Sequence, residues 1–191
     1  MSTQIEQQLA GLVPGTYQID ASHSEVGFTV RHLVGKVRGQ FRQFEGTIEI
    51  AEQPLESSAR ASIDLSSVDT RNADRDAHLR SGDFFSVDTH PSMSFVSTGI
   101  YDKGDRLVVT GDLTIKDVTK PLDLELEYNG TGGDPWGGTR VAFEATGTIS
   151  RKEWGVDFNL PAAGELVVIG DKVTIVLAVE AVLQQEQPAA E

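Results

Sequence analysis

Residues 70–95 hold the densest group of side chains in this chain that could do chemistry. The block contains Arg75, Asp76, His78 and His90, so that a guanidinium, a carboxylate and two imidazoles lie near one another in sequence. Groups of this kind could transfer protons or orient a polar substrate. Whether they do so depends on the elements that position them, because neighbours in sequence need not converge in space.

The histidines lack the spacing of a metal site. His23, His32, His78 and His90 form neither an HxH nor an HExxH pattern, so capping hydrogen bonds are their expected role. The chain contains no cysteine, which excludes thiolate ligands, thiol nucleophiles and disulfides. The sequence therefore predicts neither a metal nor a cofactor.

Hydrolytic chemistry of the serine type is not favoured either. The sequence has no GxSxG elbow. Ser22, His23 and Ser24 follow Asp20 on what reads as extended chain, where successive side chains point to opposite faces. A nucleophile with a base beside it is therefore not evident.

Acidic residues strongly outnumber basic ones. The 29 Asp and Glu residues against 16 Lys and Arg give a formal net charge of −13. This charge repels phosphodiester backbones and anionic lipid headgroups, so neither nucleic-acid binding nor stable membrane anchoring is expected. The N-terminal residues resemble no signal peptide, and no stretch approaches the roughly 18 apolar residues of a membrane span. A cytoplasmic protein is predicted.

Three parts are predicted along the chain. Residues 1–15 are polar and form an N-terminal arm, and residues 184–191 form a low-complexity tail. Residues 16–183 form one domain, in which alternation of apolar and polar residues predicts about nine strands. The one helical pattern covers residues 72–81, where acids come early and Arg80 comes late.

The strand pattern favours a closed barrel over a sandwich. Each strand has one apolar and one polar face, as in residues 24–32, and closure removes exposed edges. Turn signals such as Asn129-Gly130 separate the strands, and one bend is expected to join two of them. We therefore predict an all-β protein, an antiparallel up-and-down barrel of about eight strands with one short helical insertion.

Small residues on the inward faces leave two possibilities for the barrel interior. Gly46, Ala61, Gly111 and Ala145 either fit the taper and coiling of the strands or leave an open lumen. An open lumen would be apolar and elongated, and would suit a lipid-like chain. Its predicted apolar lining consists of Val26, Phe28, Val30, Phe95, Leu107, Val109, Leu113, Leu124, Phe143, Ile175 and Leu177.

We interpret residues 70–95 as a plug for one end of this barrel rather than as a reaction centre. Arg75 and Asp76 are expected to fasten the plug through hydrogen bonds to strand-end backbone, while Phe84 and Phe85 face the lumen. The block supplies no nucleophile and no second catalytic carboxylate pair, which a reaction centre would need.

Polar residues near the barrel mouths could meet a ligand's polar end. His32 lies inside by strand parity and is the strongest candidate. Arg151 and Asn159 could contact a headgroup as well, although Arg151 could equally pair with a carboxylate in this acidic protein.

Aromatic residues near Gly155 and in a glycine-rich turn have separate expected roles. Trp154 and Phe158 flank Gly155 and are expected to close the barrel end opposite residues 70–95. Trp136 is expected at the surface or in the contact of a homodimer.

Four motifs in sequence order resemble those of the YceI-like family of lipocalin-like, isoprenoid-binding proteins. The family's first hairpin is similar to YQIDASHSEVGFTVRHLVGKVRGQF, and its insertion to residues 70–95. Its paired strands are similar to GDLTIKDVTKPLDLELEYNG, and its late turn to SRKEWGVDFN, where Trp154 replaces a frequent Phe. The resemblance covers about residues 15–183 and implies a long barrel whose apolar tunnel holds a polyisoprenoid or similar lipid.

Together these observations favour a non-catalytic protein that carries or stores a long apolar molecule. A polyisoprenoid, an isoprenoid quinone or a fatty-acid-like chain would fit, held by burial of apolar surface. The alternative is an enzyme that acts on a lipid-like or small apolar substrate through His32 or through Arg75, Asp76 and His78. A filled barrel that serves as an interaction module is the third hypothesis.

Overall fold

Strands make up most of the protein in the computed structural model, which describes residues 4–161, 164 and 167–185. Residues 1–3 of the predicted arm and 186–191 of the predicted tail lie outside the described residues. The helical elements are α1 (Gln4–Gln8), α2 (Ala73–Arg80) and the 3₁₀ helices η1 (Ala21–His23), η2 (Pro54–Glu56), η3 (Leu65–Ser67) and η4 (Arg151–Trp154). The strands are β1 (Gly15–Ile19), β2 (Glu25–His32), β3 (Gly35–Phe41), β4 (Phe44–Ile50), β5 (Ser58–Asp64), β6 (Val68–Asp69), β7 (Ser92–Asp102), β8 (Leu107–Ile115), β9 (Val118–Gly133), β10 (Thr139–Ser150) and β11 (Ile169–Leu183).

The sheet closes on itself because β1 pairs with β11 as well as with β4. The closed order is β1-β4-β5-β7-β8-β9-β10-β11, with every pair antiparallel. β2 pairs with the first half of β11, β3 pairs with β2, and β6 pairs with β3. Within the described residues, β1 with β2, β3 with β4 and β5 with β6 thus act as three bent strands. The result is the predicted eight-stranded up-and-down barrel, with three bends instead of one.

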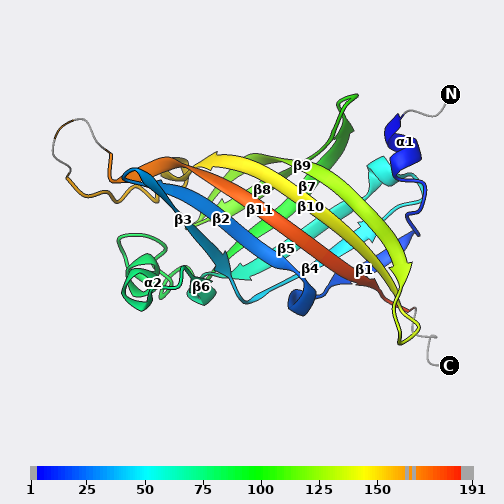
Figure 1. Ribbon diagram of the computed structural model, residues 1–191, viewed down its shortest axis with the longest axis horizontal. Coiled ribbons are helices and arrows are strands. Elements are labelled where there is room, and N and C mark those ends of the chain that lie inside the picture. The colour runs from blue at the N-terminus through cyan, green and yellow to red at the C-terminus, as the bar shows by residue number, and fades with distance from the viewer. Residues whose placement is uncertain (1–3, 162–163, 165–166, 186–191) are drawn as a thin grey trace.

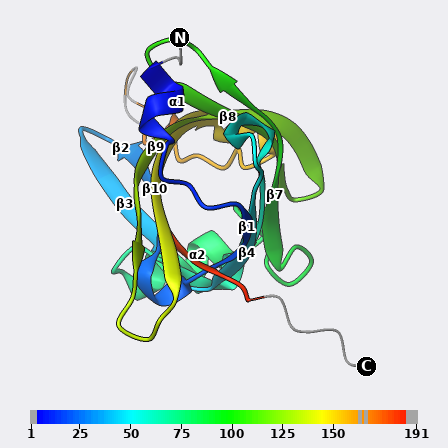
Figure 2. The ribbon, with the colours of Figure 1, turned by 90° about the vertical axis from the view of Figure 1, so that its right-hand side faces the viewer.

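The barrel is long, and its two ends differ (Figure 1). The α2 end carries α2, the β2–β3 turn and the loop before β11. The α1 end carries α1 and lies where β1 begins and β11 finishes. Figure 2, which looks at the α1 end, shows the segment between α1 and β1 crossing the opening. None of the helices that the structure describes has the length and hydrophobicity to cross a bilayer.

The predicted turn at Asn129-Gly130 is wrong, because both residues lie inside β9. Ala142 of β10 pairs with Gly130, whereas the next residue of β10, Phe143, pairs with Tyr128. Asn129 is therefore the extra residue of a β-bulge, and Gly130 takes a φ of 139°, which favours glycine. Continued pairing along both strands overrides the local turn signal, and the chain reverses only after Gly133.

Candidate functional site: the barrel lumen

Two apolar cavities lie in series inside the barrel. The first has a volume of about 180 Å³ and extends toward α1, while the second has a volume of about 470 Å³ and extends toward α2. Val26, Ile63, Phe95 and Leu177 line both cavities and so mark the boundary between them. The lumen is thus open on both sides of one constriction made of apolar side chains.

The small inward residues do not all have the same effect on the lumen: some accommodate a neighbouring side chain, and others leave space open. A Cβ on Gly111 would overlap Cζ of Phe95 and lie 2.7 Å from the carbonyl O of Val96, so the Phe95 ring already fills that space. Ala61 and Ala145, in contrast, line the first cavity. Glycine lets an aromatic ring lie against the strand, while alanine leaves volume open.

Most residues of the predicted lining contact one of the two cavities. The predicted residues that line only the first cavity are Leu107, Val109, Leu124 and Phe143. The predicted residues that line only the second cavity are Phe28, Val30, His32, Phe84, Phe85, Leu113, Arg151, Phe158 and Ile175. Trp154 and Asn159 line neither.

The N-terminal segment contributes to the site in a way that the sequence analysis missed. Leu9 and Leu12 line the first cavity, and Ile5 and Leu9 are buried against Leu107. The arm therefore covers the α1 end of the lumen. Its signal was the spacing of Ile5, Leu9 and Leu12, which is the four-then-three spacing of one helical face.

The residue block after β6 is fastened as a plug at the α2 end. Oδ1 of buried Asp76 accepts hydrogen bonds from the backbone N and Oγ1 of Thr70, at 2.9 Å and 2.6 Å. Arg75 donates from Nε to Oγ1 and from Nη2 to the carbonyl O of Thr70, both at 2.7 Å. The predicted fastening of α2 to strand-end backbone is confirmed, and these polar groups serve it directly.

The expectation that Trp154 and Phe158 close the opposite end is wrong. The ring of Phe158 lies 5.2 Å from that of Phe84 and 4.9 Å from that of His78, between centroids. Nε2 of His78 also lies 2.8 Å from Oδ2 of Asp83. In an up-and-down barrel alternate connections share an end, and the β10–β11 connection therefore lies beside α2.

Arg151 is a structural residue of the β10–β11 connection. Its guanidinium donates to the carbonyl oxygens of Val156 at 2.7 Å, Phe158 and Gly170 at 2.9 Å, and Ile169 at 3.3 Å. Burial lowers the pKa of Arg151, while the nearby carboxylates act to raise it. Although it lines the second cavity, its donors hold the loop backbone and form no hydrogen bond to a carboxylate within the described residues.

Trp154 and Asn159 hold the same connection from either side. Trp154 is only 2% exposed and donates from Nε1 to the carbonyl O of Leu113 at 2.9 Å. Asn159 donates from Nδ2 to the carbonyl O of Ile169, and its Oδ1 accepts from the backbone N of Ile169. Both residues therefore shape the α2 end without facing the lumen.

His32 stands at the mouth of the second cavity. It pairs with Ile169 at the end of β2, where it lines the cavity while its side chain is exposed. Arg75 and His78 line the same cavity. Among the described residues, most ionisable side chains that line the lumen thus lie at the α2 end, in the wider cavity, while Arg60 lines the narrower one.

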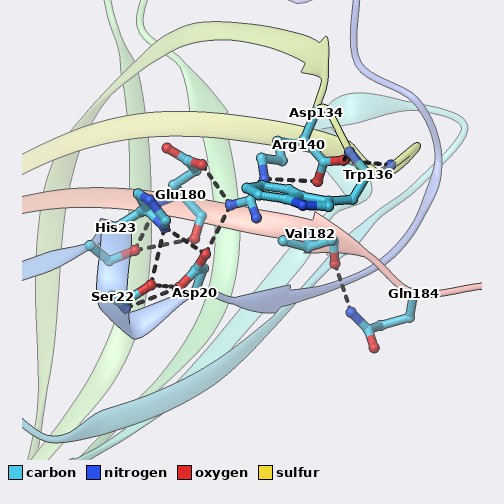
Figure 3. Close-up of polar contacts among 11 residues, drawn as sticks. Asp20, Ser22, His23, Asp134, Trp136, Arg140, Glu180, Val182 and Gln184 are labelled. Carbon is cyan, nitrogen blue, oxygen red and sulfur yellow. Dashed lines mark hydrogen bonds and ion pairs between the residues drawn. The ribbon is translucent and has the colours of Figure 1, made fainter.

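A second polar cluster lies away from the cavities, where β1 meets β11 (Figure 3). Arg140 of β10 donates to Asp20 at 2.8 Å, to Glu180 at 2.7 Å and to Asp134 at 3.0 Å. The hydrogen bond from Arg140 is the main cause that lowers the pKa of Asp20. Asp20, His23 and Glu180 are close enough to hold a cation, but the guanidinium already neutralises two of these three groups.

Comparison with known proteins agrees with this architecture. The YceI-like domain family matches residues 17–181. Protein YceI of Shigella flexneri is 39% identical over 177 residues, which cover 91% of this chain and 90% of that protein. Among solved structures, BcnA of Burkholderia cenocepacia superposes with a TM-score of 0.73 at 23% identity, over 85% of this chain and 98% of BcnA.

A further structure is described as a polyisoprenoid binding domain from Saccharophagus degradans implicated in plant cell wall breakdown. It superposes with a TM-score of 0.67 at 18% identity and covers 88% of this chain and 98% of that one. The two structural similarities concern the fold, while the family match and the identity to YceI concern the sequence itself. The chain belongs to the YceI family.

Proposed function

We propose that this protein binds a long-chain apolar lipid, such as a polyisoprenoid or an isoprenoid quinone, in its lumen and carries or stores it unchanged. The observation that carries the proposal is the pair of cavities of about 180 Å³ and 470 Å³, which lie on either side of one apolar constriction. Together they fall within the ~300–1,000 Å³ range of small-molecule sites. Each methylene buried in such a lumen contributes about 0.8 kcal/mol.

The distribution of polar side chains supports one orientation of the ligand. His32, Arg75 and His78 line the wider cavity at the α2 end, whereas the lining of the narrower one is largely apolar and contains Arg60 as its one ionisable side chain among the described residues. A polar headgroup would therefore lie toward α2, where hydrogen-bonding groups and exposure to water are available. The apolar tail would pass Phe95 toward α1.

The comparisons support the class of ligand but leave its identity to experiment. The Saccharophagus degradans domain, which has the same fold, is described as binding polyisoprenoids. A fatty-acid-like chain has the same apolar character and is the competing occupant. The two differ in mass, so that one measurement on the bound molecule distinguishes them.

A carrier is favoured over an enzyme by the hydrogen bonds of the α2 plug. Arg75 and Asp76 both form hydrogen bonds with Thr70, so these two side chains hold the plug in place. Separate substitutions of His32, Arg75 and His78 test the alternative. A carrier loses affinity or stability in these variants, whereas an enzyme loses turnover while it still binds.

Native mass spectrometry of the protein purified from its own host tests the proposal. We expect a co-purifying lipid that organic extraction releases and whose mass identifies it. Ala61→Phe adds a ring to the first cavity and should lower occupancy, whereas Ser62→Phe, at a neighbouring position that lines neither cavity, should not. A wild-type protein that retains no lipid, or an Ala61→Phe variant as loaded as wild type, would overturn the proposal.

The cellular location and the oligomeric state are two further predictions from the sequence. A cytoplasmic location is checked by fractionation of host cells. A homodimer would use exposed apolar surface such as Trp136, which is 81% exposed, and is checked by the mass of the assembly in the same native spectra.

A further inference from the structure

The β2–β3 turn at the α2 end has apolar residues where turn chemistry favours polar ones. Two-residue hairpin turns usually contain Asn, Asp or Gly, but the two turn residues here are Leu33 and Val34. Leu33 takes a φ of 52°, in the left-handed region, and Val34 is 93% exposed. A turn that breaks local preference and exposes its apolar side chain is a candidate for a contact with another molecule.

The turn belongs to a larger apolar tip. The backbone N of Leu33 donates to the carbonyl O of Val168 at 2.8 Å, which joins the turn to the loop before β11. In that loop Leu160 and Val167 are also exposed, and Leu160 lines the second cavity. The apolar tip, made of Leu33, Val34, Leu160 and Val167, therefore borders the mouth of the lumen.

The hairpin that carries this tip is basic although the protein is acidic. Residues 26–44 contain four of the 16 basic residues and none of the 29 acidic ones. Arg31 and Lys36 lie directly opposite each other on β2 and β3, and Arg38 lies two residues further along the same face. Like charges placed opposite each other on a sheet destabilise it, unless an external anion offsets the repulsion.

These three cations form no ion pair with an acidic side chain among the described residues, whereas Arg42 near the base of the hairpin pairs with Asp69. The net charge of −13 predicts repulsion from anionic surfaces, but salt screens charges beyond about 8 Å at physiological ionic strength. The local basic residues therefore dominate the electrostatic interaction between the tip and a nearby surface. Apolar side chains flanked by Lys and Arg match an anionic bilayer, whose headgroups are negative and whose interior is apolar.

We propose that the β2–β3 hairpin docks this protein transiently on an anionic lipid bilayer, with the mouth of the second cavity facing the membrane. Val34 and its apolar neighbours enter the interfacial region, while Lys36 and Arg38 contact headgroups. A lipid then moves between bilayer and lumen along an apolar path past Leu160. This last step rests on the proposed lipid-binding function, whereas docking itself can be measured without it.

Flotation of the full-length protein with vesicles tests the docking. We expect it to float with vesicles of phosphatidylcholine and phosphatidylglycerol, to float far less with phosphatidylcholine alone, and to dissociate at about 1 M salt, where the Debye length falls to about 3 Å. Each basic side chain near an anionic surface strengthens binding about fivefold, so Lys36→Gln/Arg38→Gln should weaken partitioning roughly 30-fold. Val34→Asp should weaken it on the order of tenfold or more, because a valine leaves the apolar phase.

Matched variants at the other end of the barrel separate the tip from general charge effects. Trp136→Asp changes an exposed turn residue, and Lys103→Gln/Arg106→Gln removes the same charge from the β7–β8 turn. Both should float like wild type, and thermal unfolding should show every variant folded. Docking is overturned if wild type does not float with anionic vesicles, or if the tip and control variants bind equally.

Lipid occupancy measured on the same samples distinguishes the two proposals. A protein that carries lipid but does not float retains the carrier function and refutes docking. A protein that floats through its tip but contains no lipid supports docking and refutes the carrier.

Discussion

The rings of Phe84 and Phe158 meet with their centroids 5.2 Å apart, although one follows α2 and the other follows η4. The plug after β6 and the connection before β11 are thus two halves of one cap over the wider cavity. His78 contacts both rings and so joins the two halves. Opening this end of the lumen requires the two halves to separate, so their coupling can be measured.

Phe84→Ala and Phe158→Ala should therefore be non-additive in stability. Phe84→Ala should lower the free energy of unfolding by about 3 kcal/mol, as for other buried phenylalanines. The pair should show a coupling of about 0.5–1.5 kcal/mol in a double-mutant cycle from urea unfolding. Phe143, which packs on Tyr128, gives the control, because its removal should add to that of Phe84 without coupling. Strict additivity of the first pair would contradict a shared cap.

Asp76→Ala should loosen the plug. It leaves the backbone N–H and hydroxyl of buried Thr70 without their acceptor, at a cost of about 1–3 kcal/mol. Asp74→Ala changes an exposed carboxylate in the same helical turn and should cost less than about 1 kcal/mol. Urea unfolding with hydrogen exchange of α2 measures both. Equal losses in the two variants would show that Asp76 does not fasten the plug.

Acid should weaken the seam between β1 and β11 through Asp20. The hydrogen bond from Arg140 lowers the pKa of Asp20 in the folded protein, so the ionised carboxylate favours folding. That contribution is complete above the ordinary Asp pKa of about 3.9 and disappears as the pH falls through the lower folded value. Asp20→Asn should therefore lose less stability than wild type between about pH 7 and about pH 2. Asp105→Asn, which removes a carboxyl at a largely exposed position, is the matched control for the loss of one negative charge.

Gly111→Ala should strain the constriction between the two cavities. The added methyl overlaps the Phe95 ring, which must swing into the lumen at a cost of about 1–3 kcal/mol. Gly132→Ala places its methyl where no atom lies within 4 Å and should be neutral in unfolding experiments. The displaced ring should also reduce lipid occupancy in native mass spectra. A stable, fully loaded Gly111→Ala variant would show that the constriction adapts freely.

The barrel was predictable because alternation is a property of local sequence. Val26, Phe28 and Val30 must share a face in any strand, and a chain of such strands has to close or expose an edge. Most of the strand residues that line the lumen follow from the same parity. Three bends appeared in place of one: η1 separates β1 from β2, η3 separates β5 from β6, and Arg42 and Gln43 separate β3 from β4.

Residue types and their two-residue period thus determined the fold class and most of the lining of the lumen, because both depend on neighbours in sequence. Tertiary structure decided which loops share an end, at which small residues an aromatic ring fills the space, and where the charged groups find partners. Arg140 and Asp20 are 120 residues apart in sequence and 2.8 Å apart in space. Such contacts depend on closure of the whole barrel, which no local pattern contains. The polar cluster after β6 therefore looked reactive in sequence and proved to be a fastening in the fold.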